Sequence, residues 1–585
     1  MSLIKPLGLP KAGSTGQFVV DGVADGYEAF ALAQAAAEVA LDGPIVFVAR
    51  DGQRLPAIIE ALAFVAPGLP VLEFPAWDCL PYDRVSPGSE AAARRLDALS
   101  AMAVLAKEPH RAVILTTANA ILQRVPPAEA IEAQTFRARP GNQVDMNVLV
   151  SRLENSGFDR VSTVRDIGEF AVRGGILDLY APGSAEALRL DFFGDTLESI
   201  RAFDVATQRT TGQRNLVTLQ PMSEVTLTPE AISRFRRSYI EAFGAPSRDD
   251  GLYAAISEGR RFAGMEHWLP FFYERLETLF DYLPGVPVVF DHLAREALGE
   301  RHTLILDYYQ ARKEQASGAL KDAVPYQPVP PGLMYLTPDD VASVLPDRIA
   351  IEFTGFDAPD HDGRKLLHAG AHAGRGFELE RADPNINVFA AAVAHISEMR
   401  AAGRRVVIAG WTEGSLDRLG QILAEHELGN LKKVSTLAEV EKLAAGQAGL
   451  AVLPLEAGFV AGNLVVVAEQ DILGDRLVRR SKKRKRASDF IAEAASLSAG
   501  DIVVHADHGI GRFIGLRTIE AVGAPHDCLE IHYAGDDRLF LPVENIELLS
   551  RYGSDTAEAT LDKLGGGAWQ SRKARLKKRL LEMAG

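Results

Sequence analysis

The sequence predicts a multidomain α/β protein. It combines a parallel-sheet domain, a β-rich insertion, a further small α/β domain, and a small C-terminal β-barrel of the SH3/Tudor type followed by a basic helix. The first 125 residues alternate short apolar runs with helix-length segments, which is typical of a parallel sheet covered by helices. Residues 150–218 carry strand patterns and turn signals with little helix. At roughly 150 residues per domain, a chain of 585 residues corresponds to about four domains.

The first domain is predicted over residues 1–125 and, after an insertion, over 219–350. Its predicted strands are FVV (18–20), IVFVA (45–49), VLEF (71–74) and AVILT (112–116), with helices over 27–41 and 54–64. Composition changes near RVPPAEA (124–130), so the β-rich insertion is placed at 126–218. Because helices and apolar strands such as VPVVFD (286–291) return after the insertion, we expect the first domain to resume there.

Four segments are predicted after the first domain. A small α/β domain occupies 351–477, where strand RRVVIAG (404–410) leads into helix SLDRLGQILAEH (415–426). A basic linker follows at 478–498, with seven Lys and Arg residues between Arg479 and Arg486. A small β domain occupies 499–553. A linker and a basic amphipathic helix occupy 554–585.

Charge and cysteine content restrict the class of protein. The formal net charge of −15 argues against a protein that coats nucleic acid along its whole surface, so contact with DNA would have to be local. Cys79 and Cys528 are the only cysteines, which is typical of a reducing cytoplasm. The first residues lack the apolar core of a signal peptide, and no apolar run reaches the ~20 residues that cross a bilayer. We therefore predict a cytoplasmic protein that is not inserted in a membrane.

The segment QFVVDGVADGYEAFALAQ has the strand–turn–helix order of a phosphate-binding loop. Such a loop needs a Gly-Lys-Ser/Thr sequence, whose lysine and hydroxyl engage phosphate and magnesium. Gly22 and Gly26 are present, but Tyr27 and Glu28 stand where lysine and Ser/Thr are required. VVFD (288–291) resembles the acidic strand of a nucleotide hydrolase, but without a phosphate-binding loop it is better explained as a buried strand end. The sequence therefore predicts a degenerate loop, with no catalytic site and no bound cofactor in this chain.

A metal site is the other candidate. His505, His508, His526, Cys528 and His532 gather in the C-terminal β domain. However, DCLEIHYA places Leu529, Ile531 and Tyr533 on the opposite, inward face of the strand, so the polar set is expected on a solvated face. Structural zinc sites favour closely spaced Cys or His pairs. We therefore predict no metal.

Two long stretches carry a family resemblance. EFPAWDCLPYDRVSPGSEAAARRLDALSAM (73–102), joined with EFAVRGGILDLYAPGSAEALRLDFFGDTLESIRAFDVATQRT (169–210), resembles the UvrB-like module at the N-terminus of transcription-repair coupling factors. VVHADHGIGRFIGLRTIE and CLEIHYAGDDRLFLPVENIELLSRYG (503–553) resemble the RNA-polymerase-interacting, CarD-like domain of the same family. LDKLGGGAWQSRKARLKKR (561–579) resembles the segment that follows this domain.

The resemblance implies a function. It implies a bacterial protein that binds the β subunit of stalled RNA polymerase and recruits UvrA for transcription-coupled nucleotide excision repair. The ATP-dependent translocase that acts on double-stranded DNA, with its ATP and magnesium, would lie C-terminal to this chain, which we expect to act as a monomer. Two alternatives from other classes are a UvrB-like DNA-dependent ATPase and a stand-alone CarD-type transcription regulator.

The resemblance also assigns candidate UvrA-binding residues. The pattern V-R-G-x-[IL]-L-D-L maps onto Arg173, and R-L-D-F-F maps onto Arg189 and Phe193. Gly174 and Gly175 follow Arg173, so a partner can approach the backbone closely there. Arginine and aromatic residues are frequent interface anchors. The alternative is that Phe193 belongs to the core and that the two arginines are merely solvated.

In the polymerase-interacting domain, the family pattern T-[LI]-E places the main apolar contact at Ile519, flanked by Leu516, Arg517 and Thr518. A small barrel leaves an open strand edge, which can bind a partner by strand addition. The alternative is that Ile519 is an ordinary core residue.

Contact with DNA has two candidates. The final helix brings Arg572, Arg575 and Arg579 roughly onto one face, although the same helix could instead be solvated and pack its leucines on another domain. The basic linker could touch DNA, but its position between two domains favours an extended, solvated tether.

Overall fold

The computed structural model describes residues 3, 5–10, 14–40, 42–181, 184, 186–248, 250–316, 326–358, 363–383, 385–474, 502–505, 508–521, 524–535, 537–542, 549–551, 561 and 563. The predicted basic linker at 478–498 lies outside these residues, as do Arg572, Arg575 and Arg579. Within the described part of the chain, no helix is both long and apolar enough to cross a membrane.

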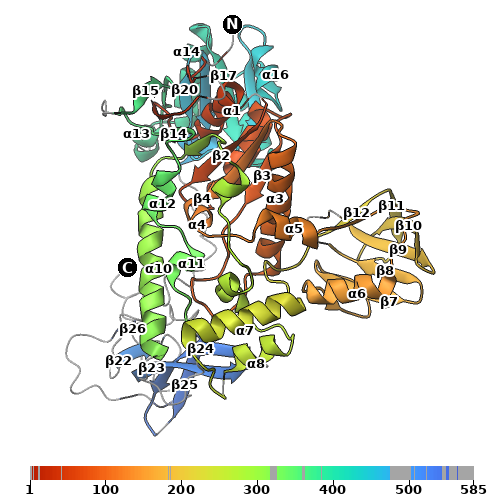
Figure 1. The fold of residues 1–585 in the computed structure, drawn as a ribbon. Coiled ribbons are helices and arrows are strands. Elements are labelled where there is room, and N and C mark those ends of the chain that lie inside the picture. The colour runs from red at the N-terminus through yellow and green to blue at the C-terminus, as the bar shows by residue number, and fades with distance from the viewer. Residues whose placement is uncertain are drawn as a thin grey trace.

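A seven-stranded parallel sheet forms the centre of the first domain (Figure 1). Across the sheet its strands are β15 (Lys365–His368), β1 (Gly16–Asp21), β14 (Ile349–Phe353), β13 (Val288–Phe290), β2 (Pro44–Ala49), β4 (Ala112–Thr117) and β3 (Val71–Phe74). β13 and β14 separate β1 from β2, so the chain after the insertion completes the middle of this sheet. The segment continues past residue 350, where the sequence placed a boundary, because β14 spans this position and β15 pairs with β1 at the sheet edge.

Helices cover both faces of this sheet, as the alternating side chains of its strands require. On one face, α1 (Glu28–Val39) and α2 (Leu55–Val65) pack on residues such as Phe18, Phe47 and Ile351. On the other face, Val46, Ile114 and Phe290 lie in a second core. That core is closed by α3 (Ser89–Lys107), α4 (Ala118–Ile121), α9 (Leu279–Tyr282), α10 (Ala294–Ala316) and α12 (Pro338–Ser343).

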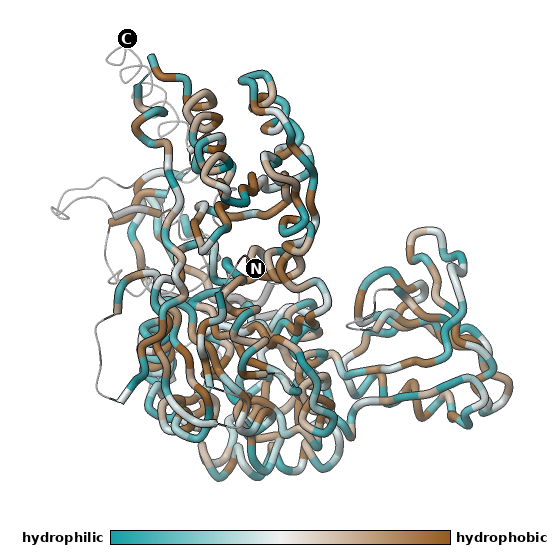
Figure 2. The backbone as a smooth tube through the Cα atoms, turned by 90° about the horizontal axis from the view of Figure 1, so that it is seen from above, coloured by the Kyte–Doolittle hydropathy of each residue, from teal (hydrophilic) through white to brown (hydrophobic). Residues whose placement is uncertain are grey.

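The insertion projects from this body as a separate lobe (Figures 1 and 2). It is attached through α5 (Ala128–Gln134) and the two-stranded pair of β5 (Phe136–Ala138) with β12 (Val217–Leu219). Its six-stranded sheet has the order β11 (Thr210–Arg214), β10 (Thr196–Phe203), β9 (Ala187–Phe193), β8 (Ile176–Leu179), β7 (Glu169–Arg173) and β6 (Asp159–Arg160). α6 (Met146–Asn155) buries Leu149 and Leu153 in the core on one face of this sheet.

A helical unit follows the insertion. It consists of α7 (Pro229–Phe243), α8 (Gly251–Ser257), the 3-10 helix η1 (Met265–Phe271) and α11 (Pro331–Met334). Its aromatic core includes Phe235, Trp268 and Tyr335. It is joined to the first domain by the buried ion pair of Arg95 with Glu224, whose Nε and Oε1 atoms lie 2.6 Å apart.

The second α/β unit has a six-stranded sheet. Its order is β16 (Ala371–Ala373), β20 (Phe459–Ala461), β21 (Leu464–Ala468), β17 (Arg405–Gly410), β19 (Ala448–Val452) and β18 (Leu431–Lys433). Its helices are α13 (Glu378–Ala382), α14 (Val388–Ala401), α15 (Glu413–Glu425), α16 (Leu437–Glu441) and α17 (Glu469–Leu473). Val407, Phe459 and Val466 belong to the same core as α1 and α2, so these helices lie between the two sheets.

The C-terminal β domain is a five-stranded antiparallel sheet. Its order is β25 (Arg538–Pro542), β24 (Ala524–His532), β23 (Gly509–Ala521), β22 (Ile502–His505) and β26 (Leu549–Arg551). Within the described residues no pairing joins β25 to β26, so closure into a barrel stays a prediction.

Candidate partner-binding surfaces

One face of the insertion sheet carries its main core, and the other carries ionic side chains beside a small apolar cluster that includes Ala171 and Phe203. Strand register places Leu177, Leu190 and Ile200 side by side, and these residues are buried against α6. The neighbouring register rows project to the opposite face. One row contains Arg173, Ile176, Asp191 and Ser199, and the other contains Ala171, Asp178, Arg189 and Arg201.

Arg173 ends β7 at a tight turn and is exposed. The turn needs glycine, because Gly174 has a φ of +62° and a Cβ on Gly175 would lie 2.7 Å from the Phe192 carbonyl oxygen. The Arg173 guanidinium donates hydrogen bonds to the Ser162 carbonyl at 2.7 Å and the Thr163 hydroxyl at 3.0 Å. Arg173 is therefore oriented while its charge faces solvent.

Arg189 differs from the prediction of an accessible anchor. Its Nε and Nη2 atoms donate to the two carboxylate oxygens of Asp178, at 2.7 and 2.8 Å. The guanidinium also lies 4.9 Å from the centre of the Phe203 ring. These hydrogen bonds raise the pKa of Arg189 above its ordinary value. With 16% of its side chain exposed and Asp178 at 2%, Arg189 is held largely inside this face.

Phe193 ends β9, at the hairpin turn into β10, and 76% of it is exposed. This exposure contradicts the alternative that Phe193 belongs to the core. Alternation along β9 places it on the same face as Arg189 and Asp191. The three predicted residues therefore share one face of the sheet, with Arg173 at the turn between β7 and β8 and Phe193 at the turn between β9 and β10.

Two further ionic side chains occupy the same face. Arg201 donates to Asp191 through Nε at 2.9 Å and Nη2 at 2.7 Å. Although burial opposes it, Arg201 and the Ser199 hydroxyl hold the pKa of Asp191 below its ordinary value. Sequence reasoning missed Arg201 and Asp178. Strand alternation in ESIRAF could have placed Arg201 on a polar face, but no local signal pairs it with β9.

The predicted polymerase-binding residues Leu516, Arg517, Thr518 and Ile519 all lie on β23. β24 pairs with β23 along this stretch, but β22 covers β23 only from Gly509 to Arg512. Among the described residues, the second edge of β23 at 516–519 therefore faces no strand. Ile519 is half-buried, whereas Phe513 and Ile531 form the buried core of this domain. This geometry leaves room for the strand addition that the sequence suggested.

Arg517 belongs to an ionic group on this sheet. Its Nε atom lies 2.5 Å from Oε2 of Glu530, whose other oxygen is 2.7 Å from Nε2 of His532. Glu530 is 1% exposed and Cys528 is also buried. The expectation of a solvated face is therefore wrong for Cys528, because Cys528 and Glu530 are buried on this face of β24, as Leu529 and Ile531 are on the other. His532 is 34% exposed, and the side chain of His526 lies outside the described part. In the described part of the chain, no three His, Cys, Asp or Glu residues form a group that could hold a metal.

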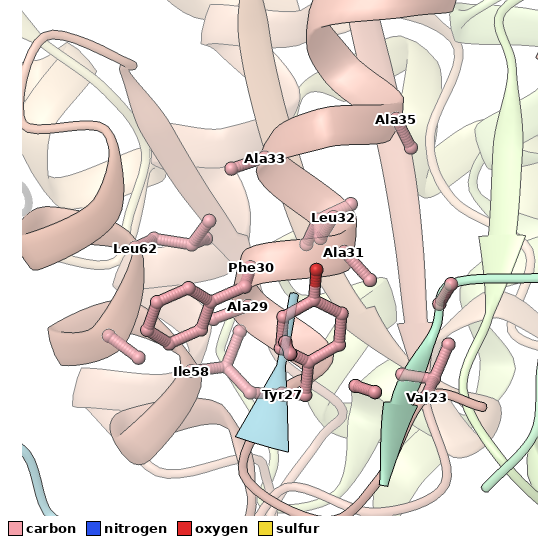
Figure 3. Close-up of a cluster of buried hydrophobic side chains, with 14 of the residues drawn as sticks. Val23, Tyr27, Ala29, Phe30, Ala31, Leu32, Ala33, Ala35, Ile58 and Leu62 are labelled. Atoms are coloured by element: carbon pink, nitrogen blue, oxygen red, sulfur yellow. The ribbon is translucent and has the colours of Figure 1, made fainter. Parts of the chain in front are cut away.

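The turn between β1 and α1 is filled by side chains and by the second α/β unit. Tyr27 is fully buried beside Phe30 (Figure 3), and the centres of their rings are 5.6 Å apart. The ring of Phe459 lies 5.1 Å from that of Tyr27. Gly26 has a φ of +87°, and a Cβ there would lie 2.6 Å from the Ala457 carbonyl oxygen. The space above this turn is therefore occupied by residues that follow β19.

Buried charges surround the same turn. Glu28 accepts a hydrogen bond from the Gly26 amide at 2.9 Å and forms an ion pair with Arg54. Arg54 also lies 3.6 Å from Oδ2 of Asp291, directly after β13. Burial raises the pKa of Glu28 to about 7, against the attraction of Arg54, and it also raises the pKa of Asp291. One guanidinium thus faces two buried carboxyl groups at the C-terminal edge of the sheet.

Comparisons with known proteins identify two domain types in this order. A family model described as the UvrB interaction domain matches residues 136–225, and one described as the CarD-like/TRCF RID domain matches residues 497–553. The transcription-repair-coupling factor of Rickettsia bellii (strain RML369-C) is 31% identical over 546 residues, covering 92% of this chain and 46% of that protein.

Two other transcription-repair-coupling factors are similar to the same extent. That of Myxococcus xanthus is 32% identical over 578 residues, and that of Escherichia coli (strain K12) is 30% identical over 556 residues. Each match covers 93% of this chain and 46% of the relative, so the chain spans about half the length of the curated relatives it matches. By these two domain types and this similarity, the chain belongs to the transcription-repair-coupling factor family and corresponds to its N-terminal region.

Proposed function

We propose that this chain couples transcription to DNA repair by binding RNA polymerase, through its β subunit, and recruiting UvrA for nucleotide excision repair. The observation that carries the proposal is the presence of both partner-binding domain types on one chain. Two features of these domains support the proposal: the exposed Phe193 on the insertion, and the edge of β23 at 516–519 that β22 does not cover. A stand-alone CarD-type regulator would have no need of the insertion.

The UvrA contact is proposed for Arg173, Arg189 and Phe193, which share one face. Replacing all three by alanine should abolish UvrA binding, because arginine and aromatic anchors typically contribute about 2 kcal/mol or more each. Binding is measured with purified UvrA by calorimetry, and circular dichroism monitors folding. Unchanged affinity in a folded triple variant would disprove this contact.

The polymerase contact is proposed for the 516–519 segment of β23. Ile519→Arg should abolish binding to the polymerase β subunit while the domain stays folded, because the side chain is half-buried beside a free edge. A pull-down with the β subunit measures binding. Loss of β-sheet signal in circular dichroism would show instead that Ile519 is a core residue.

We infer that the β1–α1 turn does not hydrolyse ATP, against the alternative of a UvrB-like ATPase. The inference is supported by buried Tyr27, by Glu28 in place of a phosphate-binding group, and by the Ala457 carbonyl against Gly26. An ATPase assay with double-stranded DNA tests it, and DNA-stimulated hydrolysis by this chain would refute it. We place the family's ATP-dependent, magnesium-dependent DNA translocase outside these 585 residues.

We further propose that the chain is a cytoplasmic monomer whose contact with double-stranded DNA is limited. The net charge of −15 supports a local contact. Arg572, Arg575 and Arg579 stay the candidates, and alanine replacement of all three should weaken DNA binding in an electrophoretic shift assay.

A further inference from the structure

The polar face of the insertion sheet carries three arginines, Arg173, Arg189 and Arg201, which differ in how far their side chains are exposed. Arg189 is largely buried, because Asp178 holds it through two hydrogen bonds and Phe203 lies against its guanidinium. Arg173 is open at one hairpin tip. Arg201 is intermediate, with 35% of its side chain exposed.

Strand register defines where Arg201 lies. It is directly opposite Arg189 on the neighbouring strand β10, and Asp191, its ion-pair partner, is two residues along β9 from Arg189. Phe193 is a further two residues along β9. Phe193, Asp191 and Arg201 therefore form one continuous strip across β9 and β10.

Exposure of a phenylalanine to this extent is unfavourable in water, since burying such a side chain gains about 1.5–3 kcal/mol. Three arginines lie on this face, and two of them, Arg189 and Arg201, are already paired with Asp178 and Asp191 within the sheet. A partner surface that complements it must offer an apolar pocket for Phe193 and carboxylates for the arginines.

We infer that Arg201 is a further residue that contacts UvrA. The strip of Phe193, Asp191 and Arg201 fits a surface of UvrA with an apolar pocket flanked by carboxylates. Asp178 is a positioning residue, because it fixes the orientation of Arg189. The inference rests on the proposed function of the same face. Arg201 contacts the partner through the part of its guanidinium that Asp191 leaves free. Arg189 reaches the partner only through the 16% of its side chain that is exposed, and Asp178 holds it in that position.

The test measures the affinity of the full chain for purified UvrA at low and high salt. Arg201→Ala should weaken binding by roughly tenfold, and Arg201→Glu by more. The salt dependence of the affinity should also become smaller, because a charge pair across the interface is lost. A purely structural role for Arg201 would change the melting temperature without changing this salt dependence.

Two variants control the measurement. Arg214→Ala removes an arginine from the neighbouring strand β11, where it pairs with Ile200 in register and so lies on the other face. Its affinity for UvrA should equal that of the wild-type chain. The double variant Arg201→Ala/Asp191→Asn also removes the charge of the carboxylate that the single variant leaves without a guanidinium partner. It should bind as weakly as Arg201→Ala.

Asp178→Asn replaces the carboxylate that accepts two hydrogen bonds from Arg189 with a neutral amide, so the affinity for UvrA should fall. Asp178→Glu keeps a carboxylate at this position and should recover part of the affinity. If Arg201→Ala or the double variant binds UvrA with wild-type affinity, and Phe193→Ala still weakens binding, the inference about Arg201 is wrong but the proposed function stands. Failure of the wild-type chain to bind UvrA would overturn both the inference and the proposed function.

Discussion

Glu28 provides a sharp prediction, because it is buried beside one guanidinium and a second buried carboxyl group. Its pKa rises from 4.5 to about 7 through burial. In the pH range between these values, the folded chain keeps a proton that the unfolded chain releases. The stability from this proton is fully present below pH 4.5 and is lost as the pH rises to about 7.

The magnitude follows from the two pKa values. At about 1.4 kcal/mol for each tenfold change in proton affinity, the loss between low and high pH is roughly 3 kcal/mol. Glu28→Gln is neutral at every pH and can still accept the Gly26 amide hydrogen bond. The stability of this variant relative to the wild-type chain should therefore increase by roughly that amount as the pH rises from 5 to 8.

Melting temperatures measured at pH 5, 6, 7 and 8 test this prediction. At about 2–4 °C per kcal/mol for units of 150–250 residues, the difference should grow by several degrees across the series. Glu60→Gln on the exposed side of α2 is the control for removing a carboxylate. A difference between Glu28→Gln and the wild-type chain that stays constant with pH would refute the reasoning.

Three other substitutions test particular contacts. Phe459→Ala removes the ring that packs edge-on against Tyr27 and should cost about 3–5 kcal/mol in urea unfolding, while a loss below about 1 kcal/mol would show that the two units do not share a core. Arg95→Met leaves the carboxylate of Glu224 buried without its guanidinium and should cost about 3–5 kcal/mol, much of which Arg95→Met/Glu224→Leu should restore. If the double variant is no more stable than Arg95→Met, the lost free energy of unfolding comes from packing and not from the unpaired charge of Glu224. Phe193→Ser should leave the free energy of unfolding unchanged within about 0.5 kcal/mol, because the ring is exposed, and a clear loss would show that it packs within the insertion.

Sequence patterns predicted the local elements well. FVV, IVFVA, VLEF and AVILT lie in β1, β2, β3 and β4, and the helices predicted over 27–41 and 54–64 correspond to α1 and α2. These predictions succeed because the spacing of apolar residues records which side of each element is buried. The family resemblance, carried by long motifs, agrees with both domain types found in the comparisons.

Strand order was decided only by the tertiary structure. β13 and β14 are far from β1 and β2 in sequence, yet they lie between them in the sheet. β15 joins the same sheet beyond the boundary placed at residue 350. Apolar strands carry little information on which neighbour they pair with, because any parallel partner buries the same side chains.

The sequence by itself determined the family, the positions of most elements and the candidate contact residues, because each of these is written in local motifs and periodicity. The tertiary structure decided which candidates are accessible. Arg189 and Phe193 come from one motif, but only Phe193 is open, since Asp178 from another strand neutralises and holds the arginine. Likewise Arg54 and Asp291 meet Glu28 at the β1–α1 turn from distant segments. Ion pairs and burial depend on distances in space, and spacing along the chain does not fix those distances.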